Sequence, residues 1–270
     1  MPELPEVETT VRGLAPVLHG QRLTRVVANR ADLRRAMPVD LGQRLTGAMV
    51  TGLSRRAKYG LIDTDRGDSF IFHLGMSGRW RVDPLEPWTH DHLVLETAGG
   101  RQVVLNDPRR FGSVDLMPTA DVAAWPPFVA LGPEPLGLDL TPEHLERRFA
   151  GRIAPVKLVL LDQRIVAGLG NIYVCEALNV ARIAPTRPAG QIAPERLAAL
   201  VDAIRAVLLS AIEAGGSTLR DYARPDGELG YFSKQFRVYG REGEACPCGG
   251  TVERRVDGGR STFWCRMCQQ

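Results

Sequence analysis

The second residue of the chain is a candidate nucleophile. The sequence opens Met1-Pro2-Glu3, and a small residue after the initiator favours removal of Met1, which leaves the Pro2 nitrogen as a secondary amine. An α-amino group has a pKa of about 7.7 to 8.0, against roughly 10.4 for a lysine side chain, so a useful fraction is unprotonated at neutral pH. Such an amine can attack an electrophilic carbon without first being buried. The alternative interpretation is that Pro2 is only a chain end.

The residues after Pro2 are expected to form a helix that begins beside this amine. Apolar side chains recur every three or four residues over residues 4–18, and Pro5 suits the first turn. The positive end of the helix dipole disfavours protonation of a neighbouring amine and favours a carboxylate such as Glu3 or Glu6. We therefore predict an acidic group beside the Pro2 nitrogen.

Beyond this helix the sequence pattern changes twice. Between residues 23 and 117, short runs rich in Val, Ile and Leu alternate with glycine-bearing turns, which is typical of β-strands. Residues 118–140 are rich in proline and glycine, and we interpret them as a linker without regular elements. Helical patterns return with a start at Thr141 and with apolar helices over 155–163 and 194–214. We predict an α+β protein with a β-rich domain over 1–118, a linker over 119–140, a helical domain over 141–234 and a cysteine-bearing hairpin over 235–270.

Composition and charge limit the class of protein. The chain has 270 residues, of which 44% are apolar and 24% are charged, as in ordinary globular domains. We expect a cytosolic protein with no membrane partner, because no leader pattern or apolar run of roughly 20 residues is present. The net charge of +3 allows a nucleic-acid partner without requiring one. Residues 234–270 hold seven basic and four acidic side chains, so this segment alone accounts for the excess.

Four of the five cysteines lie in the last 25 residues and form two close pairs. In a reducing compartment, such pairs around a short basic hairpin more often bind zinc than form disulfides. The second pair has the usual two-residue spacer and the first has only one, although two glycines follow it. The remaining Cys175 lies in an apolar helical pattern and is expected to be buried. The predicted metal ligands are Cys246, Cys248, Cys265 and Cys268.

Several loops carry cations or large apolar side chains. Residues 55–60 concentrate three cations, which alone is more often a solvated turn than a site. Met76, Arg109 and Phe111 lie on glycine-bearing loops of the β-rich domain, where they could fill a duplex from which a base has been extruded. The turn before Asn171 contains two glycines, and Asn171 is a good N-cap, so this turn suits a phosphate.

The ordered set of motifs closely resembles the bacterial formamidopyrimidine-DNA glycosylase family. The resemblance spans nearly the whole chain and includes the loops and cysteines described above. The matching motifs are Pro2-Glu3-Leu4-Pro5-Glu6-Val7-Glu8-Thr9, Arg56-Ala57-Lys58-Tyr59, His73-Leu74-Gly75-Met76-Ser77-Gly78, Asp107-Pro108-Arg109-Arg110-Phe111-Gly112, Leu131-Gly132-Pro133-Glu134-Pro135-Leu136, Gly170-Asn171-Ile172-Tyr173 and the cysteine hairpin.

The resemblance implies a bifunctional base-excision repair enzyme that removes oxidised purines and then cuts the DNA strand. It implies an N-terminal β-sandwich with flanking helices, a helix-two-turn-helix domain and a C-terminal zinc finger. Pro2 would attack C1′ of the damaged nucleotide, and Glu3 would act as general acid on the sugar. Lys58 would contact phosphate and assist elimination, and Arg260 would contact phosphate and assist δ-elimination. The zinc ion would be structural, and no catalytic metal or organic cofactor is implied.

The resemblance also assigns DNA contacts, with damaged duplex DNA as the partner of a monomeric enzyme. Met76, Arg109 and Phe111 match the residues that fill the void left by the extruded nucleotide. Without the resemblance, the sequence around the histidines would favour a structural role for them. The matched DNA-contacting residues are His73, His90, His92, Arg109, Arg152, Lys157 and Asn171.

Two departures from the family pattern and two alternatives stay open. The first cysteine pair is one residue short of the commoner spacing, and Arg220 stands where a lysine is common in the loop over 213–222 that covers the purine. A related glycosylase for oxidised pyrimidines shares the chemistry of the N-terminal proline. Its sequence usually opens Pro-Glu-Gly-Pro, whereas this chain has Pro2-Glu3-Leu4-Pro5. A non-catalytic protein that binds damaged DNA would keep the fold, but here Pro2, Glu3 and Lys58 are all present.

Overall fold

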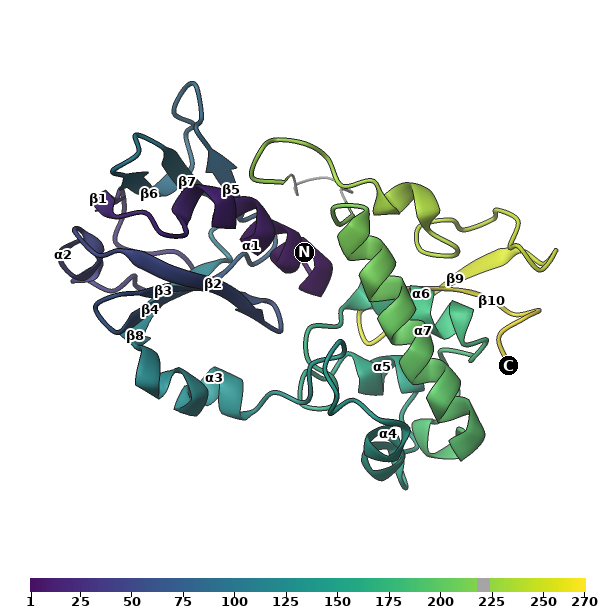
Figure 1. The fold of residues 1–270 in the computed structure, drawn as a ribbon. Helices are drawn as coiled ribbons and strands as arrows, with labels where there is room; N and C mark the ends of the chain where they lie inside the picture. The colour runs from purple at the N-terminus through teal and green to yellow at the C-terminus, as the bar shows by residue number, and fades with distance from the viewer. Residues whose placement is uncertain (218–223) are drawn as a thin grey trace. The chain divides into compact units, whose positions relative to one another are not determined.

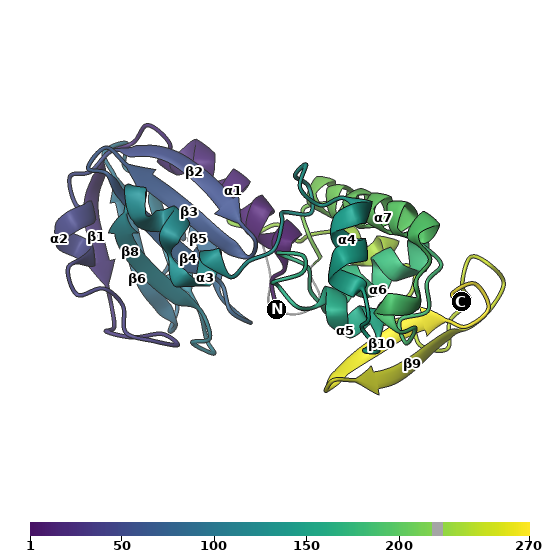
Figure 2. The same cartoon turned by 90° about the horizontal axis from the view of Figure 1, so that it is seen from below.

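The chain divides into two compact units, which Figures 1 and 2 show in ribbon form. The computed structural model describes residues 1–217 and 224–270. The first unit comprises residues 1–129 with 214–233, and the second comprises 130–213 with 234–270. The domain boundaries that we predicted at 118, 140 and 234 stay predictions.

The first unit consists of two antiparallel four-stranded sheets and a long N-terminal helix. The helix α1 covers Leu4–Leu18, as the apolar spacing predicted. One sheet has the order β1-β6-β7-β5 and the other the order β2-β3-β4-β8. The strands are β1 (Leu23–Ala28), β2 (Val50–Arg56), β3 (Tyr59–Thr64), β4 (Asp68–His73), β5 (Arg79–Val82), β6 (Asp91–Thr97), β7 (Gln102–Asn106) and β8 (Ser113–Pro118).

Both sheets and helix α1 contribute to a single hydrophobic core. Leu14 of the helix, Leu93 of one sheet and Phe70 of the other are each at most 1% exposed within this cluster. Trp80 packs edge-on against Phe70 and Phe72, with ring centroids 6.2 Å and 5.4 Å away. The mixed fold with two packed sheets confirms the predicted α+β class.

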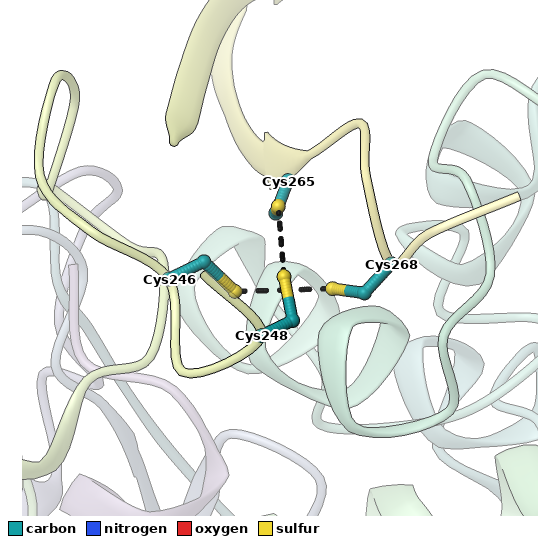
Figure 3. Close-up of side chains that lie close together, drawn as sticks. All are labelled: Cys246, Cys248, Cys265 and Cys268. Atoms are coloured by element: carbon teal, nitrogen blue, oxygen red, sulfur yellow. Dashed lines mark hydrogen bonds between the residues drawn. The ribbon is translucent and has the colours of Figure 1, made fainter. Parts of the chain in front are cut away.

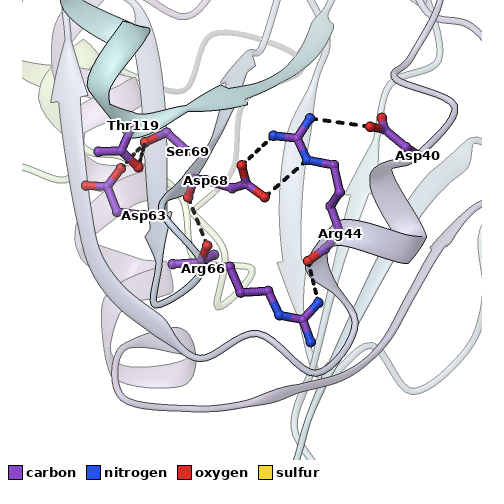
Figure 4. A network of polar contacts seen from close by, with 8 residues as sticks. Asp40, Arg44, Asp63, Arg66, Asp68, Ser69 and Thr119 are labelled. Atoms are coloured by element: carbon purple, nitrogen blue, oxygen red, sulfur yellow. Dashed lines mark hydrogen bonds and ion pairs between the residues drawn. The ribbon is translucent and has the colours of Figure 1, made fainter.

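A polar network joins the short helix α2 (Leu41–Leu45) to the second sheet (Figure 4). The guanidinium of Arg44 pairs with Asp68 at the start of β4 and with Asp40 at the N-cap of its own helix. The neighbouring Ser69 hydroxyl bridges Asp63 and Thr119. These bonds lie at the start of β4, at the end of the strand opposite His73.

The prediction of a linker without regular elements over residues 118–140 was wrong in part. A 3-10 helix, η1 (Thr119–Ala124), and a short helix, α3 (Pro126–Val129), lie at its beginning. Proline is compatible with a first helical turn, so the proline-rich composition did not exclude these helices. The rings of Trp125 and Phe128 each pack edge-on against Tyr59 at 5.4 Å, which holds the segment on strand β3.

The second unit is helical and ends in a two-stranded hairpin. Helix α6 packs against α7 and against strand β10. Cys175 of α6 is 1% exposed, as expected, and its cluster includes Cys246 and Cys265. The elements are α4 (Pro142–Phe149), α5 (Val156–Leu160), α6 (Asn171–Val180), η2 (Ala189–Gln191), α7 (Pro194–Glu213), η3 (Phe232–Gln235, shared between the units), β9 (Val252–Asp257) and β10 (Arg260–Cys265).

A buried carboxylate docks the chain before the hairpin onto helix α6. Glu176 is 1% exposed and accepts hydrogen bonds from the backbone N–H groups of Arg237, Val238 and Tyr239 at 2.8–3.0 Å. Burial raises the pKa of Glu176, whereas these three donors oppose the shift. The start of the cysteine-bearing segment is therefore fixed by protein contacts.

Among the helices that the structure describes, none combines the length and the apolar character that a membrane span requires.

Candidate functional site

The N-terminal residues are buried at the start of helix α1. Pro2 is buried and Glu3 is 3% exposed, while Met1 is 51% exposed. Glu3 is the N-cap, and its backbone N–H donates to the Glu6 carboxylate at 2.9 Å. The reciprocal bond, from the Glu6 backbone N–H to the Glu3 side chain, completes a capping box. Pro2 therefore lies directly before the positive end of helix α1, as the sequence predicted.

Glu6 also holds a segment more than 200 residues away in sequence. Its second carboxylate oxygen accepts bonds from the backbone N–H and the hydroxyl of Ser217, both at 2.8 Å. Glu6 is 2% and Ser217 5% exposed, so these bonds are shielded from water. Ser217 lies in the middle of the loop over 213–222 that is predicted to cover a purine, and residues 218–222 of that loop, including Arg220, lie outside the described residues. The sequence singled out Glu6 as an acid at the helix start but did not reveal its link to Ser217.

Lys58 lies in the tight turn between strands β2 and β3. It is 7% exposed and follows Ala57, whose φ of +53° places it in the left-handed region. Arg55 donates to the Glu8 carboxylate at 3.0 Å and to the Ala57 carbonyl at 2.9 Å. Only part of the predicted cationic turn is a turn, because Arg55 and Arg56 complete strand β2. Arg55 braces the turn that carries Lys58.

His73, at the end of strand β4, is a neutral hydrogen-bond donor. Burial is the main cause that lowers its pKa to about 4, and the neighbouring cations Lys58, Arg34 and Arg35 lower it further. Its Nδ1 accepts from the backbone N–H of Gly75 at 3.0 Å, so the proton resides on Nε2. Since protonation would begin only near pH 4, His73 keeps this tautomer throughout the physiological range.

The loops that carry the predicted void-filling residues are joined by one buried acid, Asp107. Its carboxylate accepts from the Ser77 hydroxyl at 2.6 Å and from the backbone N–H of Gly112 at 2.8 Å. Gly75 packs so closely that an added Cβ would lie 2.3 Å from the backbone of Phe111. Asp107 and Ser77 each lie in a motif that the sequence analysis singled out, but nothing in the sequence indicated this bond.

The three predicted void-filling side chains are all exposed on these loops. Met76 is 36% and Phe111 43% exposed, and the Arg109 guanidinium lies 4.8 Å from the centre of the Phe111 ring.

The other two predicted histidines, His90 and His92, differ in exposure. His90 is exposed, whereas His92 is buried with its Nε2 2.9 Å from the Asp107 carbonyl.

In the second unit, Lys157 and Asn171 bind the hairpin. Lys157 is fully buried, and its ammonium donates to the Thr262 hydroxyl at 2.7 Å and to the Ser261 carbonyl at 3.1 Å. Burial lowers the pKa of Lys157. Asn171 donates to the same Ser261 carbonyl at 2.8 Å. The prediction of Asn171 as N-cap was wrong, because the helix begins at Asn171 and Gly170 is the N-cap.

The other predicted cations of this unit are exposed. Arg152 follows helix α4 and donates to the Arg148 carbonyl at 2.6 Å. Arg260 begins strand β10 beyond the two glycines of the hairpin turn. Both guanidinium groups can therefore reach a ligand from solvent.

The four predicted cysteines form a compact cluster (Figure 3). Their sulfur atoms all lie within 4.8 Å of one another, with Cys246 3.8 Å from Cys268 and Cys248 3.5 Å from Cys265. A backbone N–H from Gly250 bonds the Cys248 sulfur and lowers its pKa to about 7. The one-residue spacer of the first pair is therefore compatible with a four-thiolate metal site.

Comparisons with known proteins match both units. The chain matches the formamidopyrimidine-DNA glycosylase N-terminal domain over residues 1–114 and the H2TH domain of the same enzymes over 131–223. Formamidopyrimidine-DNA glycosylases of Rhizorhabdus wittichii and Novosphingobium aromaticivorans are 71% and 68% identical to it over the full length of both chains. The chain belongs to the formamidopyrimidine-DNA glycosylase family.

Solved structures of formamidopyrimidine-DNA glycosylases share the fold. The enzyme of Thermus thermophilus is 43% identical with a TM-score of 0.89 over 99% of this chain and 98% of that one. A Lactococcus lactis mutant bound to Fapy-dG-containing DNA is 34% identical with a TM-score of 0.92 over both full chains. Membership of the family makes this protein a repair enzyme for oxidised purines, a DNA glycosylase with AP-lyase activity.

Glu6 gives a test of how the glycosylase site is held. Replacing Glu6 with Ala leaves two buried backbone donors and one hydroxyl without an acceptor, which we expect to lower the free energy of unfolding by roughly 2–4 kcal/mol. We also expect slower base excision with DNA binding retained, and an intermediate effect for Glu6→Gln, which keeps one acceptor.

The matched control is Glu195→Ala, which removes an exposed first-turn acid of helix α7. It should change the unfolding free energy, measured in urea, by less than about 1 kcal/mol. Equal losses in the Glu6 and Glu195 variants would show that the buried bonds are unimportant.

Proposed function

We propose that this enzyme excises oxidised purines, notably 8-oxoguanine and formamidopyrimidines, through the amine of Pro2. After removal of Met1, the nitrogen attacks C1′ of the damaged nucleotide, the glycosidic bond breaks, and the base leaves with a proton. The C1′–O4′ bond then opens as Glu3 protonates the ring oxygen, and the Pro2 nitrogen and C1′ form an iminium ion, which acidifies the C2′ hydrogens. Loss of one of them expels the 3′-phosphate by β-elimination, and δ-elimination then expels the 5′-phosphate. No metal takes part in these steps.

The observation that carries this proposal is the burial of Pro2 and Glu3 at the N-terminal end of helix α1. The positive end of the helix dipole disfavours a positive charge on a neighbouring amine, and the Glu6 bond to the Glu3 N–H fixes the backbone at the start of the helix. Glu3 supplies the acid for the sugar ring oxygen as C1′ is attacked. Lys58, in the turn braced by Arg55, supplies a cation for phosphate and for elimination.

The proposed DNA contacts fall into two groups. Exposed side chains meet the duplex directly: Arg109 faces the base left unpaired, Met76 and Phe111 fill the void, and exposed cations bind phosphates. Neutral His73 donates its Nε2–H to a phosphate. The directly contacting phosphate ligands are His90, Arg152 and Arg260. We predicted His92, Lys157 and Asn171 as DNA contacts too, but the first two are buried and all three bind protein groups, so we propose that they position their neighbours.

A second candidate substrate class is an oxidised pyrimidine. A solved complex of the Lactococcus lactis enzyme, 34% identical to this chain with a TM-score of 0.91, contains an oxidised pyrimidine in its DNA. We favour purines because the opening reads Pro2-Glu3-Leu4-Pro5, and the same nucleophile would serve either base. Competing the two lesions in one reaction separates these specificities.

We further propose a monomeric protein that acts on the bacterial nucleoid in the cytoplasm. The proposed domains are the catalytic β-sandwich over 1–118, a linker over 119–140, the helix-two-turn-helix domain over 141–234 and the zinc finger over 235–270.

The nucleophile can be tested by substituting Pro2. We expect Pro2→Gly to lower single-turnover excision of 8-oxoguanine on the order of a thousandfold or more, because the secondary amine is lost. Binding to a duplex with an uncleavable abasic analogue should persist, since the DNA contacts are elsewhere. Unchanged excision by a variant whose N-terminus is verified by mass spectrometry would disprove the assignment.

The cysteine cluster predicts one structural zinc ion per chain. Four thiolates saturate a tetrahedral ion and leave no position for substrate, so the ion would stabilise the hairpin that carries Arg260. We expect metal analysis to give one zinc per chain and Cys248→Ser to lower both zinc content and DNA affinity. Cys175→Ser serves as the control for loss of a buried thiol that is not one of the four predicted metal ligands. Zinc-free protein with full DNA affinity would contradict the assignment.

A further inference from the structure

Arg260 lies opposite an acid with which it does not pair. In the hairpin, Arg260 of β10 is the register partner of Asp257 of β9. Side chains directly opposite in an antiparallel pair lie on one face within reach of each other, so these two would ordinarily form an ion pair. Within residues 1–217 and 224–270, however, no hydrogen bond or ion pair involves the Arg260 side chain.

The Asp257 carboxylate is bound to other groups instead. One oxygen accepts from the Thr262 hydroxyl at 2.6 Å, and the other pairs with the Arg255 guanidinium at 2.9 Å. The Asp257 side chain is only 8% exposed. Thr262 follows Arg260 by two residues and shares its face of the strand, so the carboxylate is drawn along the strand away from Arg260.

Lys157 determines that the Thr262 hydroxyl donates its proton to Asp257. Its ammonium donates to the oxygen of the Thr262 hydroxyl at 2.7 Å, so the single hydroxyl proton is left to donate to Asp257. Lys157 is fully buried, and the Thr262 hydroxyl links its ammonium to the Asp257 carboxylate. The result is an ordered chain of bonds from helix α5 to the hairpin.

We propose that Lys157 and Thr262 are positioning residues that sequester Asp257, so that the Arg260 guanidinium stays available to a DNA phosphate. This inference rests on the proposed function, in which Arg260 contacts phosphate and assists δ-elimination. Removing the Thr262 hydroxyl releases Asp257 to pair with Arg260, and the internal ion pair then competes with the phosphate. An uncharged residue at position 257 cannot compete, so it restores Arg260.

The test uses full-length variants with two measurements. One is the rate at which the β-elimination product of an abasic duplex is converted to the δ product. The other is the affinity for a duplex with an uncleavable abasic analogue. We expect Thr262→Val to lower both about two- to fivefold, the range over which a partly exposed ion pair can compete. Thr262→Ser, which keeps the hydroxyl, should behave like the parent.

The decisive variant is the double substitution Thr262→Val with Asp257→Asn. Sequestration predicts that both measurements return to the parent values, because the competing charge is gone. If the hydroxyl acted only by supporting the fold, the second substitution would remove another partner and deepen the loss. Failure to restore both values would therefore overturn the inference, as would a Thr262→Val variant equal to the parent.

Two controls separate this inference from the proposed function. Arg260→Ala measures what Arg260 itself contributes, and no effect there would refute its phosphate role and with it the consequence proposed here. If Arg260→Ala lowers the two measurements and Thr262→Val does not, sequestration of Asp257 is refuted and the phosphate role of Arg260 is not. Thr251→Val makes the same chemical change at an exposed hairpin position and should leave both measurements unchanged. If Thr262→Val lowers the unfolding midpoint strongly, Thr262→Ala is used in its place, alone and combined with Asp257→Asn.

Discussion

The arrangement at the N-terminus depends on one buried carboxylate. Glu6 accepts from the Glu3 N–H and from both donors of Ser217, and water cannot replace these bonds because both residues are buried. A buried acid is tolerated only when its oxygens are satisfied, so the helix start and the Ser217 segment are held to one geometry. The residue proposed as nucleophile is thereby set beside a helix N-terminus, and the root of the loop proposed to cover the base is fixed to the same side chain.

The same device recurs elsewhere in the chain. Asp107 joins the loops that carry Met76 and Phe111, and Glu176 binds three backbone N–H groups before the cysteine hairpin. In each case a short acidic side chain replaces regular secondary structure as the partner of loop backbone. Loops fixed in this way keep their shape while they expose cations and void-filling side chains. A DNA-repair site requires loops of this kind.

The sequence predicted the elements well where they depend on residues that are close together in the chain. The period of apolar residues gave helix α1 and helix α7, and the close cysteine pairs gave the cluster. The motifs also indicated the family, which the comparisons confirm. The sequence failed where a side chain meets a distant partner. Lys157 matches a DNA-contacting residue of the family, and nothing in the sequence indicated that the Thr262 hydroxyl, more than 100 residues later, binds its buried ammonium. Asn171 suits an N-cap, yet the Ser261 carbonyl engages its side chain one position inside the helix. The short helices after residue 118 were missed because Trp125 and Phe128 gain their stability from packing on Tyr59.

The central claim is that the amine of residue 2 becomes covalently attached to the damaged nucleotide. The direct measurement is borohydride reduction of the enzyme during its reaction with a duplex containing 8-oxoguanine opposite cytosine, followed by mass spectrometry of the adduct. We expect one stable adduct on the peptide that begins at Pro2, with Met1 absent. An adduct on Lys58 or another lysine would contradict the account, as would strand cleavage without any trapped species from a chain whose N-terminus is confirmed as Pro2.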